Sequence, residues 1–200
     1  MARPTKFTES QILDAAAAII AAAGPGAATM SAIGTAIGAP SGSLYHRFRT
    51  RDELLGRLWL EKAAFFQDRF AAALASTADP VEAGLQAALA LPRAVRDDFT
   101  AARVMLLHRR EDFLGEGWPE EMRREAERLG RQIEQALPDI TRRLFGEASK
   151  AARQTASFAL FDVPYAAVRR YVAAGKVPPA RVDALIEVAY RAVIEAGVSE

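Results

Sequence analysis

Residues 29–48 read TMSAIGTAIGAPSGSLYHRF, and this stretch decides the fold of the first part of the chain. Thr29 is a favoured N-cap residue and Gly38 is a typical helix stop, so one short helix is predicted between them. In the helix that follows the turn, Leu44 and Phe48 are four residues apart and therefore share a face. Two short helices joined by a glycine turn are typical of a helix-turn-helix.

The second of these helices has a face suited to DNA. If Leu44 and Phe48 are buried, a helical wheel of about 100° per residue turns a polar face outward. This face consists of Gly42, Ser43, Tyr45 and His46, with Arg47 on its flank. Small residues allow close approach to DNA, and the larger ones can contact phosphates or base edges. The alternative is an ordinary helix whose polar side chains are solvated.

Positive charge is concentrated beside this helix, although the formal net charge of the chain is only +1. Arg47, Arg49 and Arg51 occur before the first carboxylate, Asp52. Arg3 and Lys6 precede the first predicted helix and could add phosphate contacts. Nucleic-acid binding would therefore depend on this local patch of positive charge and not on the charge of the whole chain.

Capping signals and helical spacing of apolar residues predict helices over the rest of the chain. Thr8 with Gln11, and Thr50 with Glu53, have the spacing of capping boxes. The predicted helices cover residues 9–23, 29–37, 40–48, 50–76, 79–94, 99–110, 118–144, 149–174 and 178–196. Proline is expected to bend two of them, at Pro138 and Pro164. Because no stretch alternates with period two, the fold class is all-α with about nine helices.

Composition limits the chemistry. Without cysteine there is no disulfide, thiolate nucleophile or cysteine metal site, and a reducing cytoplasm is the expected location. The first residues lack the apolar region of a secretory signal, and the run Ala15–Ala23 is too short to span a bilayer. His46 and His108 are far apart and make a poor ligand set, so no metal or cofactor is expected. No nucleophile elbow, phosphate loop or paired carboxylates occur, which argues against an enzyme.

Aromatic and apolar residues beyond the first helices are candidates for an effector cavity, because such cavities are mostly apolar. The apolar candidates are Trp59, Phe66, Phe70, Phe99, Met105, Phe113, Trp118, Phe158, Phe161 and Tyr165. The polar residues that could orient a ligand are Arg103, His108 and Asp162. The alternative for each apolar residue is the ordinary core, and for each polar residue an ion pair or a solvated side chain.

Three segments, Thr29–Ile33, Gly38–Phe48 and Thr50–Leu55, together resemble the signature of the TetR family of bacterial repressors over about residues 8–60. The resemblance implies a helix-turn-helix DNA-binding domain over residues 1–49 and a helical effector-binding and dimerisation domain over residues 50–200. It implies phosphate contacts from Thr29, Tyr45 and Arg51. It implies base or groove contacts from Ser31, Ser41, Gly42, Ser43, His46 and Arg47.

The expected function is therefore sequence-specific binding of operator DNA by a homodimeric repressor, which a small, largely apolar effector releases. The resemblance implies that the last two helices form the dimer. The final helix is apolar on more than half of its circumference, which also favours partners on two sides. Two alternatives remain, namely a helical adaptor that uses the helix-turn-helix for protein contacts and a small-molecule enzyme on a helical bundle.

Overall fold

A computed structural model describes residues 7–113, 115 and 117–198, without the side chains of residues 41 and 198. This part of the chain is helical and contains no strand, which confirms the all-α class. The helices are α1 Glu9–Ala23, α2 Met30–Ile37, α3 Ser41–Tyr45, α4 Arg51–Leu74, α5 Pro80–Asp97, α6 Phe99–Leu107, α7 Glu120–Phe145, α8 Lys150–Ser157, α9 Val163–Ala173 and α10 Arg181–Val198. A π-helical turn joins α8 to α9 without a break, so the described residues form nine continuous helices, as predicted.

The chain divides into two compact units. Unit 1 contains the described residues up to Lys62 together with Thr100–Ala126, and unit 2 contains Ala63–Phe99 and the described residues from Glu127 onward. The predicted division lay between residues 49 and 50. Unit 1 also includes the first turns of α4, nearly all of α6 and the first turns of α7, and side chains of α4 and α6 belong to the same apolar core as those of α1 to α3.

Local capping starts the helices of unit 1 where the sequence indicates. Thr8 and Gln11 form the reciprocal capping box at the start of α1. The Thr29 hydroxyl accepts a hydrogen bond from Ala32 N at 3.1 Å and caps α2. Gly38 ends α2 with φ of 66°, a left-handed conformation that costs glycine little. These predictions are confirmed.

Two local details differ from the predictions. α3 ends at Tyr45, so it is shorter than the predicted helix, which extended to residue 48. At the start of α4 the Thr50 hydroxyl accepts from Glu53 N at 3.0 Å, as a capping box requires. The Glu53 carboxylate, however, accepts from Arg49 N at 2.8 Å, so the reciprocal bond goes to the preceding residue.

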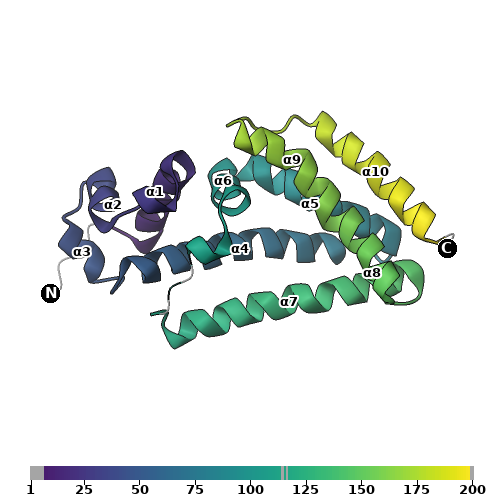
Figure 1. Cartoon of the computed structure of the whole chain (residues 1–200), viewed down its shortest axis with the longest axis horizontal. Coiled ribbons are helices and arrows are strands. Elements are labelled where there is room, and N and C mark those ends of the chain that lie inside the picture. Colours follow the sequence, from purple (N-terminus) through teal and green to yellow (C-terminus); the bar gives the residue numbers. More distant parts are fainter. Residues whose placement is uncertain (1–6, 114, 116, 199–200) are drawn as a thin grey trace. The chain divides into compact units, whose positions relative to one another are not determined.

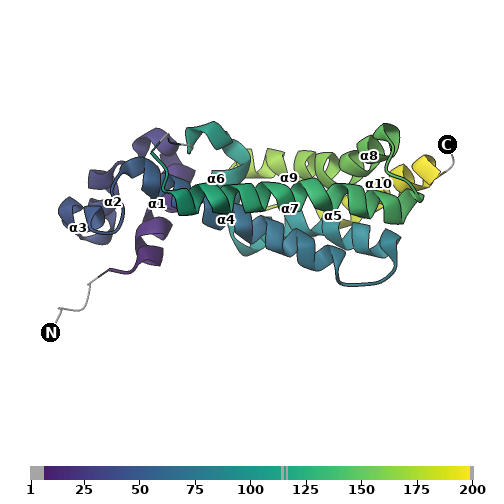
Figure 2. The ribbon, with the colours of Figure 1, turned by 90° about the horizontal axis from the view of Figure 1, so that it is seen from below.

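The helix-turn-helix is held by one apolar core. Leu44 is fully buried and Phe48 is 3% exposed, which confirms that both side chains point into the protein. Helix α2 packs against both α1 and α3 (Figures 1 and 2). The largest buried members contributed by the other helices of unit 1 are Ile12, Leu13, Ile20, Ile33, Leu54, Leu55 and Leu58.

Unit 2 is built around α5, α9 and α10, which lie side by side (Figure 1). One stripe of α10 is buried, and its members recur every four residues: Val182, Ile186, Tyr190 and Ile194. Arg96 of α5 donates two hydrogen bonds to the Asp183 carboxylate, at 2.7 and 2.9 Å, which fixes the start of α10.

The predicted bend near Pro164 takes the form of a π-helical turn over Phe158–Asp162, where Val163 N donates to Phe158 O. A widened turn relieves the clash between a proline ring and the carbonyl of the preceding turn. Helix α7 continues through Pro138. In the part of the chain that the structure describes, no helix is long and apolar enough to cross a membrane, and no three His, Asp or Glu side chains are grouped as metal ligands.

Candidate functional site

The outer face of the helix-turn-helix carries the residues that the sequence assigns to DNA. Tyr45 is 53% exposed although it is a large aromatic side chain. Thr29, Ser31, Gly42, His46 and Arg47 are also exposed. Ser43 is half-buried, and its hydroxyl donates to Pro40 O at 2.7 Å. Ser41 begins α3, but its side chain lies outside the described residues, as do Arg3 and Lys6.

Two of the arginines in this region make structural hydrogen bonds. Arg47 donates to Phe7 O at 2.9 Å and so ties the turn after α3 to the segment before α1. Arg51 is half-buried, and its guanidinium donates to Ala28 O at 2.9 Å and to Pro25 O. The side chain that the resemblance assigns to a phosphate therefore holds the start of α4 against the loop between α1 and α2.

A polar groove of about 490 Å³ lies next to this face within unit 1. Its lining includes the basic residues His46, Arg47, Arg49 and Arg57 and the acidic residues Glu9, Glu53 and Glu121. Arg57 contacts the Glu9 carboxylate at 3.4 Å and the Glu125 carboxylate at 2.9 Å. These pairs join α1 and α7 to α4, and they neutralise part of the positive charge beside the outer face of the helix-turn-helix.

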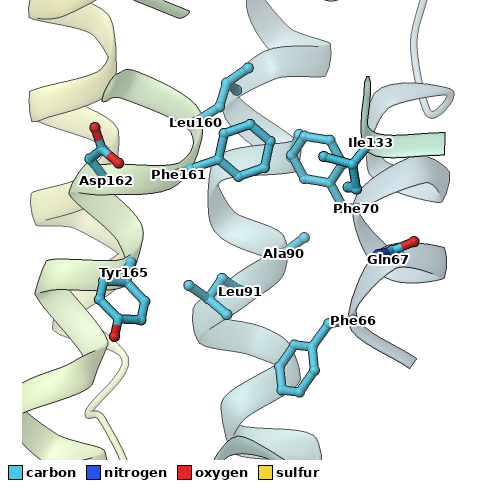
Figure 3. Close-up of a pocket in the computed structure, with 11 residues that line it drawn as sticks. Phe66, Gln67, Phe70, Ala90, Leu91, Ile133, Leu160, Phe161, Asp162 and Tyr165 are labelled. Atoms are coloured by element: carbon cyan, nitrogen blue, oxygen red, sulfur yellow. The ribbon is translucent and has the colours of Figure 1, made fainter. Parts of the chain in front are cut away.

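Unit 2 contains a half-open cavity of about 280 Å³ between α4, α5, α7 and the π turn. The Phe70 and Phe161 rings meet in it, with centroids 5.0 Å apart. Figure 3 shows Asp162 and Tyr165 on one side and Phe66, Gln67 and Phe70 on the other. The complete lining is Phe66, Gln67, Phe70, Ala87, Ala90, Leu91, Ile133, Leu160, Phe161, Asp162 and Tyr165.

Five of the predicted effector residues meet in this cavity: Phe66, Phe70, Phe161, Asp162 and Tyr165. Sequence reasoning did not single out Gln67, whose Oε1 is buried without a hydrogen-bond partner in the described part of the chain. The sequence could have pointed to Gln67, because it is a polar residue within the aromatic stretch Phe65–Phe70. The aliphatic residues of the lining cannot be distinguished from core residues in the sequence.

The other predicted effector residues lie elsewhere. Phe113 is buried in the core of unit 1, and the partly buried Trp59 and Met105 pack against this core. Arg103 donates to Ala21 O at 2.7 Å, and His108 lies beside Gly24. Trp118 packs so closely on Gly56 that a Cβ atom there would overlap with its indole. In unit 2, Phe99 begins α6 and Phe158 is 49% exposed, and neither lines the cavity.

Comparison with known proteins agrees with this arrangement. Residues 12–58 match the family model of bacterial regulatory proteins of the tetR family. The matched segment contains α2, α3, the glycine turn and the first turns of α4. A comparison with curated proteins found no match.

Solved structures share the fold over nearly the whole chain. A TetR-like transcriptional regulator from Rhodococcus sp. RHA1 has 17% identity and a TM-score of 0.70, over 96% of this chain and 95% of that chain. The regulator FadR from Bacillus subtilis in complex with stearoyl-CoA has 21% identity and a TM-score of 0.67, over 96% and 98%. The ketosteroid regulator KstR2 of Mycobacterium tuberculosis has 20% identity and a TM-score of 0.67, over 96% and 95%. Residues 12–58 thus match the tetR family of bacterial regulatory proteins, and nearly the whole chain shares the fold of a TetR-like regulator of known structure.

Proposed function

We propose that this protein is a homodimeric transcriptional repressor that binds operator DNA through α2 and α3 and leaves it when a small, largely apolar effector occupies the cavity of unit 2. The observation that carries the proposal is the division of α3 into two faces. Leu44 is fully buried, while the neighbouring Tyr45 is 53% exposed beside His46 and Arg47. An exposed aromatic side chain beside an imidazole and a guanidinium group is suited to phosphates and base edges.

Dimer formation is supported by a second apolar stripe on α10. Its buried stripe already packs within unit 2, yet Leu185 is 60% exposed and Val188 is 69% exposed on the same helix. In a homodimer this stripe meets its copy in the partner. Two reading helices would then enter successive major grooves, with centres roughly 34–36 Å apart.

Effector control is supported by the cavity and by one relative. The cavity of about 280 Å³ is lined mainly by aromatic and aliphatic side chains, as expected for a site that takes a small apolar molecule. FadR, which shares the fold, was crystallised with stearoyl-CoA. A coupling of about 1–3 kcal/mol between effector and DNA changes the affinity by roughly 5–150-fold, which is enough for a switch.

DNA binding is tested by fluorescence anisotropy with duplexes that tile the DNA upstream of the protein's own gene, at several salt concentrations. We expect one preferred duplex and a steep fall of its affinity with salt, because phosphate contacts release counterions. Equal, weak binding to all duplexes would contradict the proposal.

The reading face is tested by Tyr45→Ala. The variant should bind the preferred duplex at least about tenfold more weakly, with a melting temperature close to that of the wild type, since an exposed side chain contributes little to stability. Phe158→Ala is the matched control, because Phe158 is an aromatic side chain of similar exposure, 49%, in the other unit. A large loss of stability in Tyr45→Ala would mean that this side chain supports the core instead.

A further inference from the structure

The cavity of unit 2 is rich in groups that attract positive charge. Four aromatic rings line it, those of Phe66, Phe70, Phe161 and Tyr165. The faces of aromatic rings carry negative potential and bind cations. The ring pair of Phe70 and Phe161, with centroids 5.0 Å apart, places two such rings together. The lining therefore attracts a cation as well as apolar surface.

The polar groups of the lining have the same preference. Asp162 contributes a carboxylate, and it is exposed, so it lies at the rim of the cavity. Figure 3 shows it on the same side as Tyr165. Gln67 contributes a buried Oε1 atom that has no hydrogen-bond partner among the described residues. An unpartnered buried acceptor is satisfied by a donor on a ligand.

The described lining contains no positively charged side chain that could bind an anion. None of the residues that line the cavity is Lys, Arg or His. A carboxylate or phosphate ligand would have to leave water without a cationic partner and would lie near Asp162, which is unfavourable on both counts. The cavity should therefore bind anionic effectors more weakly than neutral ones.

From these features we infer that the effector cavity takes a compact lipophilic cation, an aromatic or aliphatic body with an ammonium head group. The apolar body lies among Phe66, Leu91 and Phe70, and the cationic head lies at the rim beside Asp162, Tyr165 and Phe161. The inference rests on the proposed effector role of this cavity and narrows the chemical class of the effector.

The test uses three para-substituted phenols that share one body and differ in the charge of a tetrahedral head group. They are para-hydroxyphenyltrimethylammonium, para-tert-butylphenol and para-phenolsulfonate. Their binding to the full chain without DNA is measured by isothermal titration calorimetry at neutral pH. We expect the cation to bind about tenfold more tightly than the neutral compound, from cation–π and rim-charge contributions, and the sulfonate to bind most weakly.

Two variants test whether the preference for the cationic compound arises in this cavity. Asp162→Asn should weaken binding of the cation about threefold, as expected for an exposed charge, and leave binding of para-tert-butylphenol unchanged. Phe161→Leu keeps the apolar volume but removes a ring, so it too should weaken the cation selectively. Asp139→Asn is the matched control, because Asp139 is an exposed carboxylate of unit 2 that does not line the cavity.

Three results would overturn the inference: no binding of the cation, equal or tighter binding of the neutral or anionic compound, or a preference that Asp162→Asn and Phe161→Leu both leave intact. Anisotropy with the preferred duplex separates this from the proposed function. If the cation binds as described but the DNA affinity does not change, the ligand class holds and the effector role fails. If DNA binding is normal and the cation preference is absent, the ligand class fails alone.

Discussion

The hydroxyl group of Tyr190 lies directly over Gly84, so that α10 approaches α5 where α5 has no side chain. Tyr190 is fully buried, and its hydroxyl donates to Val81 O at 3.0 Å. A Cβ atom at residue 84 would overlap with the hydroxyl oxygen and would lie 3.0 Å from the ring carbon that bears it. Glycine at this position is therefore required by the tyrosine.

Gly84→Ala should destabilise the protein despite the better helix propensity of alanine. Propensity favours alanine by about 1 kcal/mol, whereas overpacking of a rigid core costs about 1–3 kcal/mol. Because the ring is buried and hydrogen-bonded, we expect the cost to lie in the upper half of this range and the free energy of unfolding to fall by a net of about 1–2 kcal/mol, measured by urea denaturation. In a Tyr190→Phe background the loss should shrink clearly, since the overlapping oxygen is gone. An equal loss in both backgrounds would contradict the packing argument.

Burial of Tyr190 predicts a loss of stability in alkali. Burial raises the pKa of the Tyr190 phenol above its ordinary value of 10. The folded state then holds this proton at pH values at which the unfolded chain, with a pKa of about 10, releases it. The free energy of unfolding should therefore be unaffected by this group below pH of about 10 and should fall as the pH rises beyond it. In denaturation experiments the free energy of unfolding of Tyr190→Phe should fall less steeply with pH than that of the wild type. Identical slopes for the two proteins would show that Tyr190 does not cause the loss of stability.

Local signals made the helix-turn-helix predictable. The caps at Thr8 and Thr29, the left-handed Gly38 and the four-residue spacing of Leu44 and Phe48 depend on neighbours within one or two turns. These signals are present in the sequence itself. The early end of α3 at Tyr45 was not predicted, because no glycine or proline at residues 46–48 marks it in the sequence.

The cavity was only partly predictable because it depends on contacts between distant segments. Trp59 and Phe66 are seven residues apart on α4 and have the same hydrophobic character, yet Trp59 packs on the core of unit 1 and Phe66 lines the cavity of unit 2. Leu91 and Ile133 come from different helices and resemble core residues in the sequence. Only the three-dimensional structure shows which of these residues line the cavity and which belong to a core.

Arg51→Lys separates a structural role from a phosphate contact. Lysine keeps the charge but lacks the planar group that bonds to Ala28 O and Pro25 O together. We expect the free energy of unfolding to fall by about 1–2 kcal/mol, because at least one charge-assisted hydrogen bond is lost. The salt dependence of DNA binding should stay close to that of the wild type. Unchanged stability with weaker DNA binding would favour the phosphate contact.

The exposed stripe of α10 gives the sharpest test of the proposed dimer. Replacing both Leu185 and Val188 by Glu leaves the core of unit 2 intact, since the side chains are 60% and 69% exposed. In a dimer, however, the new carboxylates would be buried without partners, which costs several kcal/mol. At about 1.4 kcal/mol per factor of ten, the dissociation constant should rise at least about 100-fold.

Sedimentation velocity measures this change directly, with Val177→Glu as the control, because Val177 is 52% exposed but lies in the connection before α10. The double variant should sediment as a monomer with a nearly normal melting temperature and should lose most of its affinity for a two-half-site operator, because each half-site is then bound separately. A double variant that remains dimeric would place the interface on another surface, and a monomeric wild type would remove the dimer from the proposed function.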